Sequence, residues 1–286
     1  MGAKDASSRP SQAALLRRHG IRLDKALGQH FLTDARVVGR TVDAVADLAP
    51  DRVVEMASGA GALTFALLDR GWPVTALELD PRMIELLRAE TAGRALEIRP
   101  TDLARADFRA LLDELDGRVV FAGNLPYQVT SPILFGLLPA LRDPRAAGAV
   151  VMVQAEVAQR MAAAPGGRTY GVLSVLLQAA VAVERVVRVR PGCFLPPPEV
   201  ESAVVCLVRR EDAVDLQDDG RALVKELFAQ RRKQIGGLLR RGRELDEATV
   251  DRVLAAAGLE GAQRAETLAV DDFVRLRDAL REEPGR

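Results

Sequence analysis

Short runs of apolar residues alternate with amphipathic segments over the first half of the chain. Five runs have the length and composition of buried strands, at residues 52–57, 74–79, 96–99, 118–122 and 149–153. Segments 62–68 and 81–88 between them repeat apolar residues with helical spacing. Strands that alternate with helices predict an α/β fold with a mostly parallel sheet, covered by helices on both faces.

The pattern changes in the last third of the chain. Residues 184–190 and 202–208 are strand-like, and the prolines of the connection at 191–198 exclude a helix between them. Two strands joined without a crossover helix suit antiparallel pairing at the edge of the sheet. From about residue 211 the periodicity becomes helical, at 222–228, 248–256 and 271–280.

These patterns predict a flexible, basic N-terminal extension, a sheet domain and a small all-helical domain, at residues 1–20, 21–208 and 209–286. The chain of 286 residues is 48% hydrophobic, which is enough for a real core and excludes wholesale disorder. Its start lacks the apolar stretch of a signal peptide, so we expect a cytoplasmic protein without a membrane partner. The two cysteines, Cys193 and Cys206, are too few for a disulfide framework or a zinc cluster.

Forty basic residues balance forty acidic ones, so the formal net charge is zero. Taken alone, this balance argues against a nucleic-acid partner. Only Lys4, Lys25, Lys225 and Lys233 are lysines, a bias typical of GC-rich coding DNA, so arginine clusters are less informative here than usual. Charge therefore has to be weighed segment by segment.

A glycine-containing turn at residues 58–61 joins the first of these strands to the next helix. Glycines there let the backbone approach a ligand, and the helix start offers free N–H groups. The spacing is looser than a dinucleotide fingerprint, so the turn alone fits a tight bend as well as a binding site. Glu78 lies at the end of the second strand and Asp102 follows the third, on the edge where open α/β sheets bind ligands. Together these features favour a nucleoside-containing cofactor, and both NAD and S-adenosylmethionine fit them.

The segment Asn124-Leu125-Pro126-Tyr127 follows the fourth strand, on the same edge. The Asn124 side-chain oxygen and a backbone carbonyl can accept both hydrogens of an exocyclic amino group, and Tyr127 can stack on a base. These contacts draw the nitrogen lone pair out of conjugation and aim it at an electrophile such as a sulfonium methyl group. The target base has to be unpaired or flipped out of its stack. The motif therefore indicates an amino-methyltransferase acting on adenine and argues against a dehydrogenase.

With this motif the chain resembles the ribosomal RNA adenine N6-dimethyltransferase family, specifically its small-subunit branch, from about residue 20 to residue 280. Other segments that resemble the family are 25–32, 154–160, 170–175 and 194–202. Segments 230–233 and 264–266 match the small-subunit branch and separate it from the large-subunit, antibiotic-resistance branch. The resemblance implies a Rossmann-like sheet with an antiparallel edge that binds S-adenosylmethionine, followed by a helical RNA-binding domain.

The resemblance also implies site residues. Besides Asn124, the cofactor-binding residues would be His30, Leu32, Ala57, Gly59, Glu78 and Asp102. Glu78 would hold the ribose, and Asp102 would hold the amino group of the cofactor's adenine. The catalytic residues would be Asn124, Pro126, Tyr127 and Phe194. The two aromatic side chains would hold the flipped adenine of the substrate, and no metal is expected.

Members of the family convert two adjacent adenosines near the 3′ end of small-subunit (16S) RNA to dimethyladenosines, through four methyl transfers. The resemblance therefore implies dimethylation of N6 during 30S subunit biogenesis, by a monomer acting on an assembly intermediate. The residues expected to contact RNA phosphates are Lys25, Arg231, Arg232, Lys233, Arg240 and Arg241. The alternative for these basic segments is a solvated face.

Three residues depart from the family pattern. Ala57 stands where Gly is usual, and its Cβ could crowd the cofactor unless φ stays negative. His30 replaces an Asn, which makes its hydrogen bonding pH-dependent, and Ala155 replaces a Lys that would contact phosphate. Two alternatives stay open: a large-subunit adenine methyltransferase, and a non-catalytic small-subunit assembly factor, which Ala57 supports best.

Overall fold

The computed structural model describes residues 10–22 and 29–283. The chain divides into two compact units. The sheet unit holds residues 1–158 and 181–209, and the helical unit holds residues 159–180 and 210–286. The sequence pattern predicts that 159–180 belongs to the sheet domain, whereas in the structure this segment groups with the helices.

Residues 159–180 join the helical unit through contacts that are distant in sequence. Tyr170 is buried, its hydroxyl donates to the carbonyl of Leu268 at 2.9 Å, and its ring packs edge-on against Phe228. Phe228 in turn stacks on Phe273, which is also buried. A hydrophobic pattern in sequence cannot reveal which of two cores a tyrosine enters, and this explains the misplaced boundary.

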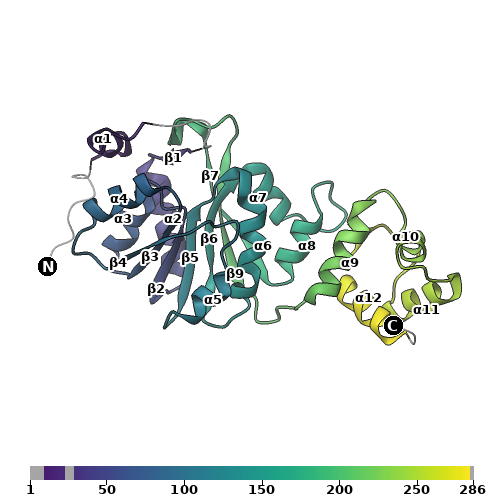
Figure 1. Ribbon diagram of the computed structural model, residues 1–286. Coiled ribbons are helices and arrows are strands. Elements are labelled where there is room, and N and C mark those ends of the chain that lie inside the picture. Colours follow the sequence, from purple (N-terminus) through teal and green to yellow (C-terminus); the bar gives the residue numbers. More distant parts are fainter. Residues whose placement is uncertain (1–9, 23–28, 284–286) are drawn as a thin grey trace. The chain divides into compact units, whose positions relative to one another are not determined.

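The described residues form a main sheet of seven strands in the order β4-β3-β2-β5-β6-β9-β7 (Figure 1). The strands are β2 (Arg52–Met56), β3 (Val74–Glu78), β4 (Leu96–Pro100), β5 (Val119–Asn124), β6 (Ala146–Gln154), β7 (Val181–Val189) and β9 (Ser202–Arg209). The first five in this order are parallel, whereas β9 runs antiparallel to both β6 and β7. The predicted sheet, mostly parallel with an antiparallel edge, is confirmed.

Helices cover both faces of the sheet because successive strand residues point to opposite sides. On one face, α2 (Ala35–Asp47) and α3 (Ala62–Asp69) pack in a single apolar core with Val120 of β5. On the other face, Phe108 of α5 (Phe108–Asp113) packs edge-on against Phe121, beside α6 (Thr130–Leu141). The sheet unit also contains α4 (Pro81–Glu90) and the start of α7 (Ala155–Met161), which ends in the helical unit.

Residues 119–141 contain no charged side chain, and they lie within the sheet unit. It forms β5, a 3-10 helix (Tyr127–Val129) and α6, so its apolar side chains fill the core. No helix of the described residues is long and apolar enough to cross a membrane.

The described part of the N-terminal segment is ordered, contrary to the expectation of a flexible extension at 1–20. Ser11 caps α1 (Gln12–Arg18), because its hydroxyl accepts from the N–H of Ala14 at 3.2 Å. Further along, β1 (Phe31–Leu32) pairs antiparallel with β8 (Phe194–Leu195) in a small second sheet. Both elements therefore become part of the sheet unit.

The helical unit contains α8 (Val172–Gln178), α9 (Gln217–Ala229), α10 (Ile235–Gly242), α11 (Glu247–Ala257) and α12 (Val270–Glu282). The predicted helices at 222–228, 248–256 and 271–280 lie inside α9, α11 and α12. The sequence did not predict α10, because three glycines lower its helical propensity. One of them, Gly236, is needed where two backbones approach closely, since a Cβ there would lie 3.1 Å from the Cα of Gly261.

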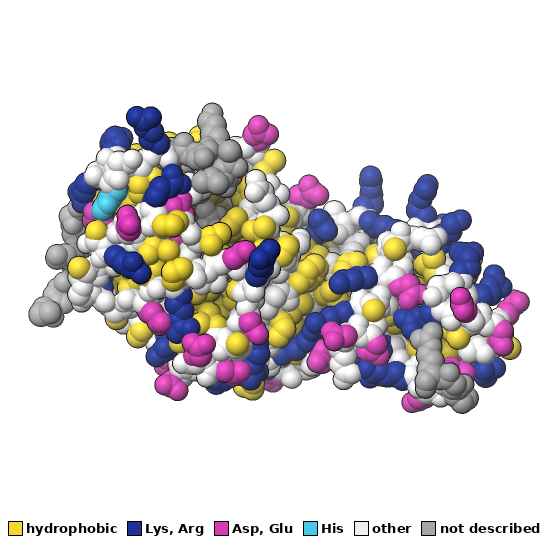
Figure 2. All heavy atoms as spheres, in the orientation of Figure 1, with side chains coloured by type: hydrophobic (Ala, Val, Ile, Leu, Met, Phe, Trp, Pro, Cys, Tyr) yellow, Lys and Arg dark blue, Asp and Glu magenta, His cyan; other side chains and the backbone are white. Residues whose placement is uncertain are grey.

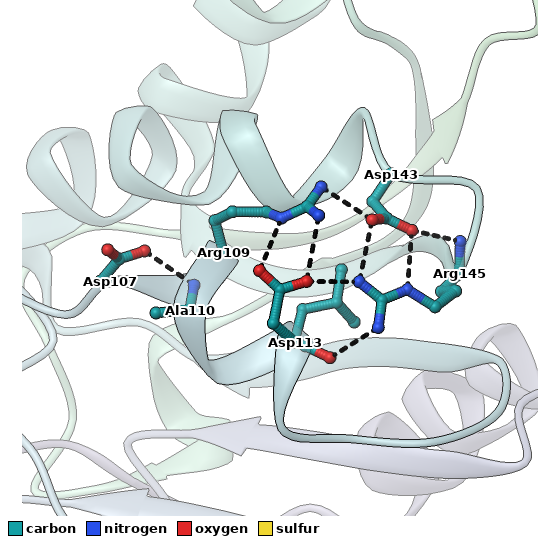
Figure 3. A network of polar contacts seen from close by, with 7 residues as sticks. Asp107, Arg109, Ala110, Asp113, Asp143 and Arg145 are labelled. Carbon is teal, nitrogen blue, oxygen red and sulfur yellow. Dashed lines mark hydrogen bonds and ion pairs between the residues drawn. The ribbon is translucent and has the colours of Figure 1, made fainter.

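A closed network of ion pairs lies at the start of β6, in the loop opposite the carboxyl ends of the strands (Figure 3). Arg145 contacts both Asp143, at 3.0 Å, and Asp113, at 2.6 Å. Arg109 closes the ring through Asp113, at 3.0 Å, and Asp143, at 2.7 Å. The network therefore ties α5 to the turn that precedes β6.

Candidate active site

A cavity of about 560 Å³ opens at the carboxyl ends of the parallel strands. Its wall includes the turn at 57–60, the segment 79–83 after β3 and the segment 123–127 at the end of β5. Nine of the predicted site residues line it: His30, Leu32, Ala57, Gly59, Glu78, Asp102, Asn124, Pro126 and Tyr127. Glu78, Asp102 and Asn124 meet here as expected, because parallel strands end on one edge. His30 and Leu32, which only the resemblance implied, line the same cavity.

Phe194 is the predicted catalytic residue that does not line the cavity. It lies in β8 opposite Leu32, is 4% exposed, and packs in the core that includes Val37 of α2. Its ring has to leave this core to stack on a base. A direct contact between Phe194 and the substrate therefore stays a prediction.

The turn after β2 adopts left-handed backbone angles at three positions. Ala57 has a φ of +57°, Gly59 of +52° and Gly61 of +84°. A Cβ on Gly61 would lie 2.8 Å from the Phe65 ring and would force a shift, so both space and backbone angle favour glycine there. A Cβ on Gly59 would lie 3.3 Å from the Phe31 ring, a tight contact, and the backbone angle is the stronger reason for glycine at this position. Because the φ of Ala57 is positive, its Cβ lies close to the following carbonyl oxygen, which strains the backbone.

The Glu78 carboxylate is held by backbone N–H groups. Its Oε2 accepts from Gly59 at 2.7 Å, and its Oε1 accepts from Leu79 at 2.8 Å and Asp80 at 2.9 Å. The hydrogen bond from the Gly59 N–H to Glu78 fixes the spacing between β3 and the turn after β2.

Asp102 is held more loosely. Its carboxylate accepts one hydrogen bond, from the N–H of Ala104 at 3.0 Å, and its side chain is 45% exposed. Both carboxylates present acceptor oxygens to the cavity.

Glu55 is a cavity residue that sequence reasoning missed. It is 1% exposed, and its Oε2 has no hydrogen-bond partner among the described residues. Burial raises the pKa of the Glu55 carboxyl to about 8, which the negative charge of Glu78 promotes and the nearby Ser58 and Thr64 hydroxyls oppose. The sequence feature that could have identified Glu55 is a carboxylate among the buried residues at the end of β2. Gln12 also lines the cavity and carried no signal in sequence, whereas Gln29 lies in the segment 25–32 that resembles the family.

The Asn124 amide is oriented by the segment that precedes β1. Its Nδ2 donates to the backbone carbonyl of His30 at 3.1 Å. This bond directs the amide so that Oδ1 is left to accept hydrogens from a ligand. The N–H of Leu125 is committed to Met152 of β6, which anchors the motif to the sheet.

The rings of Tyr127 and His30 stack, with centroids 5.7 Å apart and planes at 26°. The Tyr127 hydroxyl lies 2.6 Å from the Ser202 hydroxyl, and burial raises the pKa of Tyr127, so the ring stays neutral. His30 Nδ1 donates to the carbonyl of Pro196 at 2.8 Å, because a carbonyl can only accept. The aromatic wall is thus fixed on both sides.

The predicted RNA-contacting residues fall into two groups in the helical unit. Arg232, Lys233, Arg240 and Arg241 are exposed, and Figure 2 shows basic side chains gathered along the upper edge of this unit. Arg231 instead donates to Glu266 at 2.5 Å and to the carbonyls of Gly167 and Arg168 at 2.9 and 2.6 Å. Its donors are therefore committed to the protein. Lys25 lies outside the described residues.

The described residues contain no group of three or more His, Cys, Asp or Glu side chains arranged to hold a metal ion. The acceptor groups of residues that line the cavity include the amide oxygens of Gln12 and Gln29 and the carboxylates of Glu78 and Asp102. Such a wall suits a ligand that is rich in hydrogen-bond donors and carries positive charge.

The chain is similar to known proteins over nearly all of its length. Residues 20–280 match the family model described as ribosomal RNA adenine dimethylase. A protein of Anaeromyxobacter sp. (strain K) named ribosomal RNA small subunit methyltransferase A is 41% identical, over 95% of this chain and 98% of its own length. A protein of Geobacter metallireducens with the same name is also 41% identical, over 93% of this chain and 98% of its own.

Two solved structures resemble the fold. A dimethyladenosine transferase from Plasmodium falciparum superposes with a TM-score of 0.73 at 25% identity, covering 86% of this chain and 96% of that one. The 23S rRNA methyltransferase ErmE gives a TM-score of 0.64 at 27% identity, covering 88% and 100%. With the family model matched over most of the chain, this protein belongs to the ribosomal RNA adenine dimethylase family.

Proposed function

We propose that this chain is an S-adenosylmethionine-dependent enzyme that dimethylates N6 of two adjacent adenosines near the 3′ end of small-subunit RNA during assembly of the subunit. The observation that carries the proposal is Asn124, held by the His30 carbonyl at the edge of the cavity with its Oδ1 left as an acceptor. The names of the relatives that are 41% identical support the small subunit as the target. The 23S methyltransferase is more distant, at 27% identity, so the large-subunit alternative is not favoured.

The cavity fits S-adenosylmethionine on chemical grounds. Four of its residues have a buried polar atom without a partner among the described residues: Gln12, Gln29, Glu55 and Ser58. Such orphaned atoms are costly unless a ligand or water satisfies them. The cofactor offers an ammonium group, two ribose hydroxyls and an adenine amino group as donors. When bound, it supplies an electrophilic methyl group on a sulfonium.

The residues of the site act by positioning. Asn124 Oδ1 and a backbone carbonyl of the motif accept the two hydrogens of the substrate amine, which turns its lone pair toward the methyl group. A general base of unusual strength is not required, since the amine becomes acidic once it is methylated. The Tyr127 ring supplies a stacking surface for a base that has left its helix. The bond from Tyr127 to Ser202 and the stack on His30 keep that surface in place.

The helical unit supplies contacts to the RNA backbone in this proposal. Arg232, Lys233, Arg240 and Arg241 are exposed and can neutralise phosphates. Phosphate contacts set the position of a protein on RNA without reading its sequence. We infer that the enzyme is a cytoplasmic monomer, as the family resemblance implies. It recognises the shape of an assembly intermediate, because the net charge of zero gives little general attraction to RNA.

The test is a mass-spectrometric count of methyl groups on small-subunit RNA treated with the protein. The wild type should add four, and Asn124→Ala should reduce the rate by roughly 100-fold or more, because the interaction that it removes positions the reacting amine. Gln128→Ala is the matched control, since Gln128 is exposed and lies outside the cavity wall. RNA affinity should change little in either variant.

Three outcomes would overturn the proposal. Modification found only on large-subunit RNA would assign the chain to the other branch. Turnover that survives in Asn124→Ala would contradict the positioning mechanism. No detectable binding of millimolar S-adenosylmethionine to the wild type would favour a non-catalytic assembly factor.

A further inference from the structure

The helix α1 contributes a side chain to the cavity. Gln12 is the first residue of this helix, is 8% exposed, and lines the same cavity as Glu55 and Glu78. Its Oε1 is buried and has no hydrogen-bond partner among the described residues. A buried amide oxygen in this state loses its water without receiving a donor in return.

The position of α1 is set by contacts that do not involve Gln12. Leu15 and Leu16 are buried in an apolar cluster, packed with Phe31, Ala60, Phe65, Met83 and Leu86. This cluster joins α1 to β1, to the glycine-containing turn and to α4. At the other end of α1, Arg18 and His19 each contact Glu90 of α4 at 2.9 Å. The helix is therefore held at two places. These contacts place Gln12 at the cavity without any hydrogen bond from its own Oε1.

The chemistry around Gln12 points to a donor-rich ligand. Gln29 Oε1 is also a buried acceptor without a partner among the described residues, and Gln29 lines the same cavity. Gln29 is oriented by its Nε2, which donates to Asp80 at 3.0 Å and leaves Oε1 for another group. These two unsatisfied amide acceptors in one cavity would be satisfied together by a ligand bearing hydroxyl and ammonium donors.

We propose that Gln12 is a cofactor-binding residue, and that α1 is part of the cofactor site. Its Oε1 accepts a hydrogen bond from a ribose hydroxyl or from the α-ammonium of S-adenosylmethionine. The inference rests on the proposed function only in the identity of the cofactor. It assigns a binding role to a segment that sequence patterns treat as an extension outside the catalytic domain.

Isothermal titration calorimetry of the full chain with S-adenosylmethionine tests the proposal without use of activity. Gln12→Ala should weaken binding roughly 5- to 20-fold, the range expected for loss of one buried hydrogen bond to a ligand. Gln12→Met keeps the length of the side chain and removes the acceptor, so it should weaken binding equally. Arg17→Ala is the matched control on the exposed side of α1 and should bind within twofold of the wild type.

A second ligand separates the two donors. 5′-Methylthioadenosine keeps the ribose hydroxyls and lacks the amino acid. If Gln12→Ala weakens the binding of both ligands equally, the donor is a ribose hydroxyl. If it weakens the binding of S-adenosylmethionine alone, the donor is the ammonium. Either result supports the proposal.

The failure of this inference is distinct from failure of the proposed function. A wild type that binds the cofactor, with Gln12→Met unchanged within twofold, would overturn the role of Gln12 and leave the enzyme intact. A Gln12→Ala defect that Gln12→Met does not share would also overturn it, because shape and not the acceptor would then matter. Far-ultraviolet circular dichroism and the melting temperature of each variant identify any loss that comes from unfolding.

Discussion

Ala57 holds a backbone angle that favours glycine, at the turn that touches the cavity. Left-handed angles cost an L-residue free energy because Cβ approaches the following carbonyl oxygen. Ala57→Gly should therefore raise the free energy of unfolding by about 0.5–1 kcal/mol, after the greater freedom of glycine in the unfolded chain is subtracted. Urea denaturation followed by Trp72, the single tryptophan, measures this change in the sheet unit.

Two other alanines serve as controls for this prediction. Ala49 has a φ of +48° and is exposed away from the cavity, so Ala49→Gly should give a similar gain. Ala46 lies inside α2, where Ala46→Gly should lower the free energy of unfolding by about 1 kcal/mol. A loss of stability in Ala57→Gly would show that the Cβ packs favourably and that strain is not the dominant effect.

Among the elements, the ion-pair network holds α5 and the start of β6 together (Figure 3). The hydrogen bond from Arg145 lowers the pKa of Asp143 from 3.8 to about 2. The folded-state value is the lower one, so this carboxylate stabilises the fold above pH 4, and its contribution is lost as the pH falls toward 2. Asp143→Asn should lower the free energy of unfolding by about 1 kcal/mol at pH 7. The effect is modest because water screens the partly exposed arginines.

The measurement is urea denaturation of wild type and Asp143→Asn between pH 7 and pH 2.5. The difference between the two proteins should shrink below pH 4 as the wild-type carboxylate becomes protonated. Asp43→Asn removes an exposed ion pair with Arg70 in the same unit. It should change the free energy of unfolding little at any pH. A difference that stays constant down to pH 2.5 would mean that the charge of Asp143 is not what stabilises the element.

At the scale of the whole molecule, sequence predicted what depends on local order and missed what depends on distant packing. Glu78, Asp102 and Asn124 were predicted because each lies at or just after the carboxyl end of a strand, and parallel strands end on one edge. Gln12 reaches the cavity only through the cluster around Leu15 and Leu16, which no spacing in the sequence shows. The division of the chain depends likewise on pairs such as Tyr170 with Leu268.

Arg231 shows the same limit for charge. Its segment is basic in sequence, but its guanidinium is bonded to Glu266 and to two carbonyls. Neighbouring Arg232 and Lys233 are exposed. Sequence cannot separate an arginine that holds a fold together from one that faces a partner, and a net charge of zero sums both kinds with the acids of the cavity.

The exposed residues Arg232, Lys233, Arg240 and Arg241 should therefore account for the salt dependence of RNA binding. Replacing all four by Gln should lower the slope of log affinity against log salt by up to about 3, since each phosphate contact contributes about 0.7 to 0.9. The affinity for S-adenosylmethionine should not change, because none of the four lines the cavity. Filter binding to small-subunit particles at several salt concentrations between roughly 50 and 300 mM measures the slope.

The matched control removes two exposed arginines of the sheet unit, Arg88 and Arg185. If the helical unit carries the phosphate contacts, Arg88→Gln with Arg185→Gln should leave the slope close to that of the wild type. Equal slopes for wild type and the four-residue variant would instead identify the basic residues of the helical unit as a solvated face. In that case recognition of the particle would depend on contacts other than phosphate pairing, and Arg231 would matter only through the stability of its own unit.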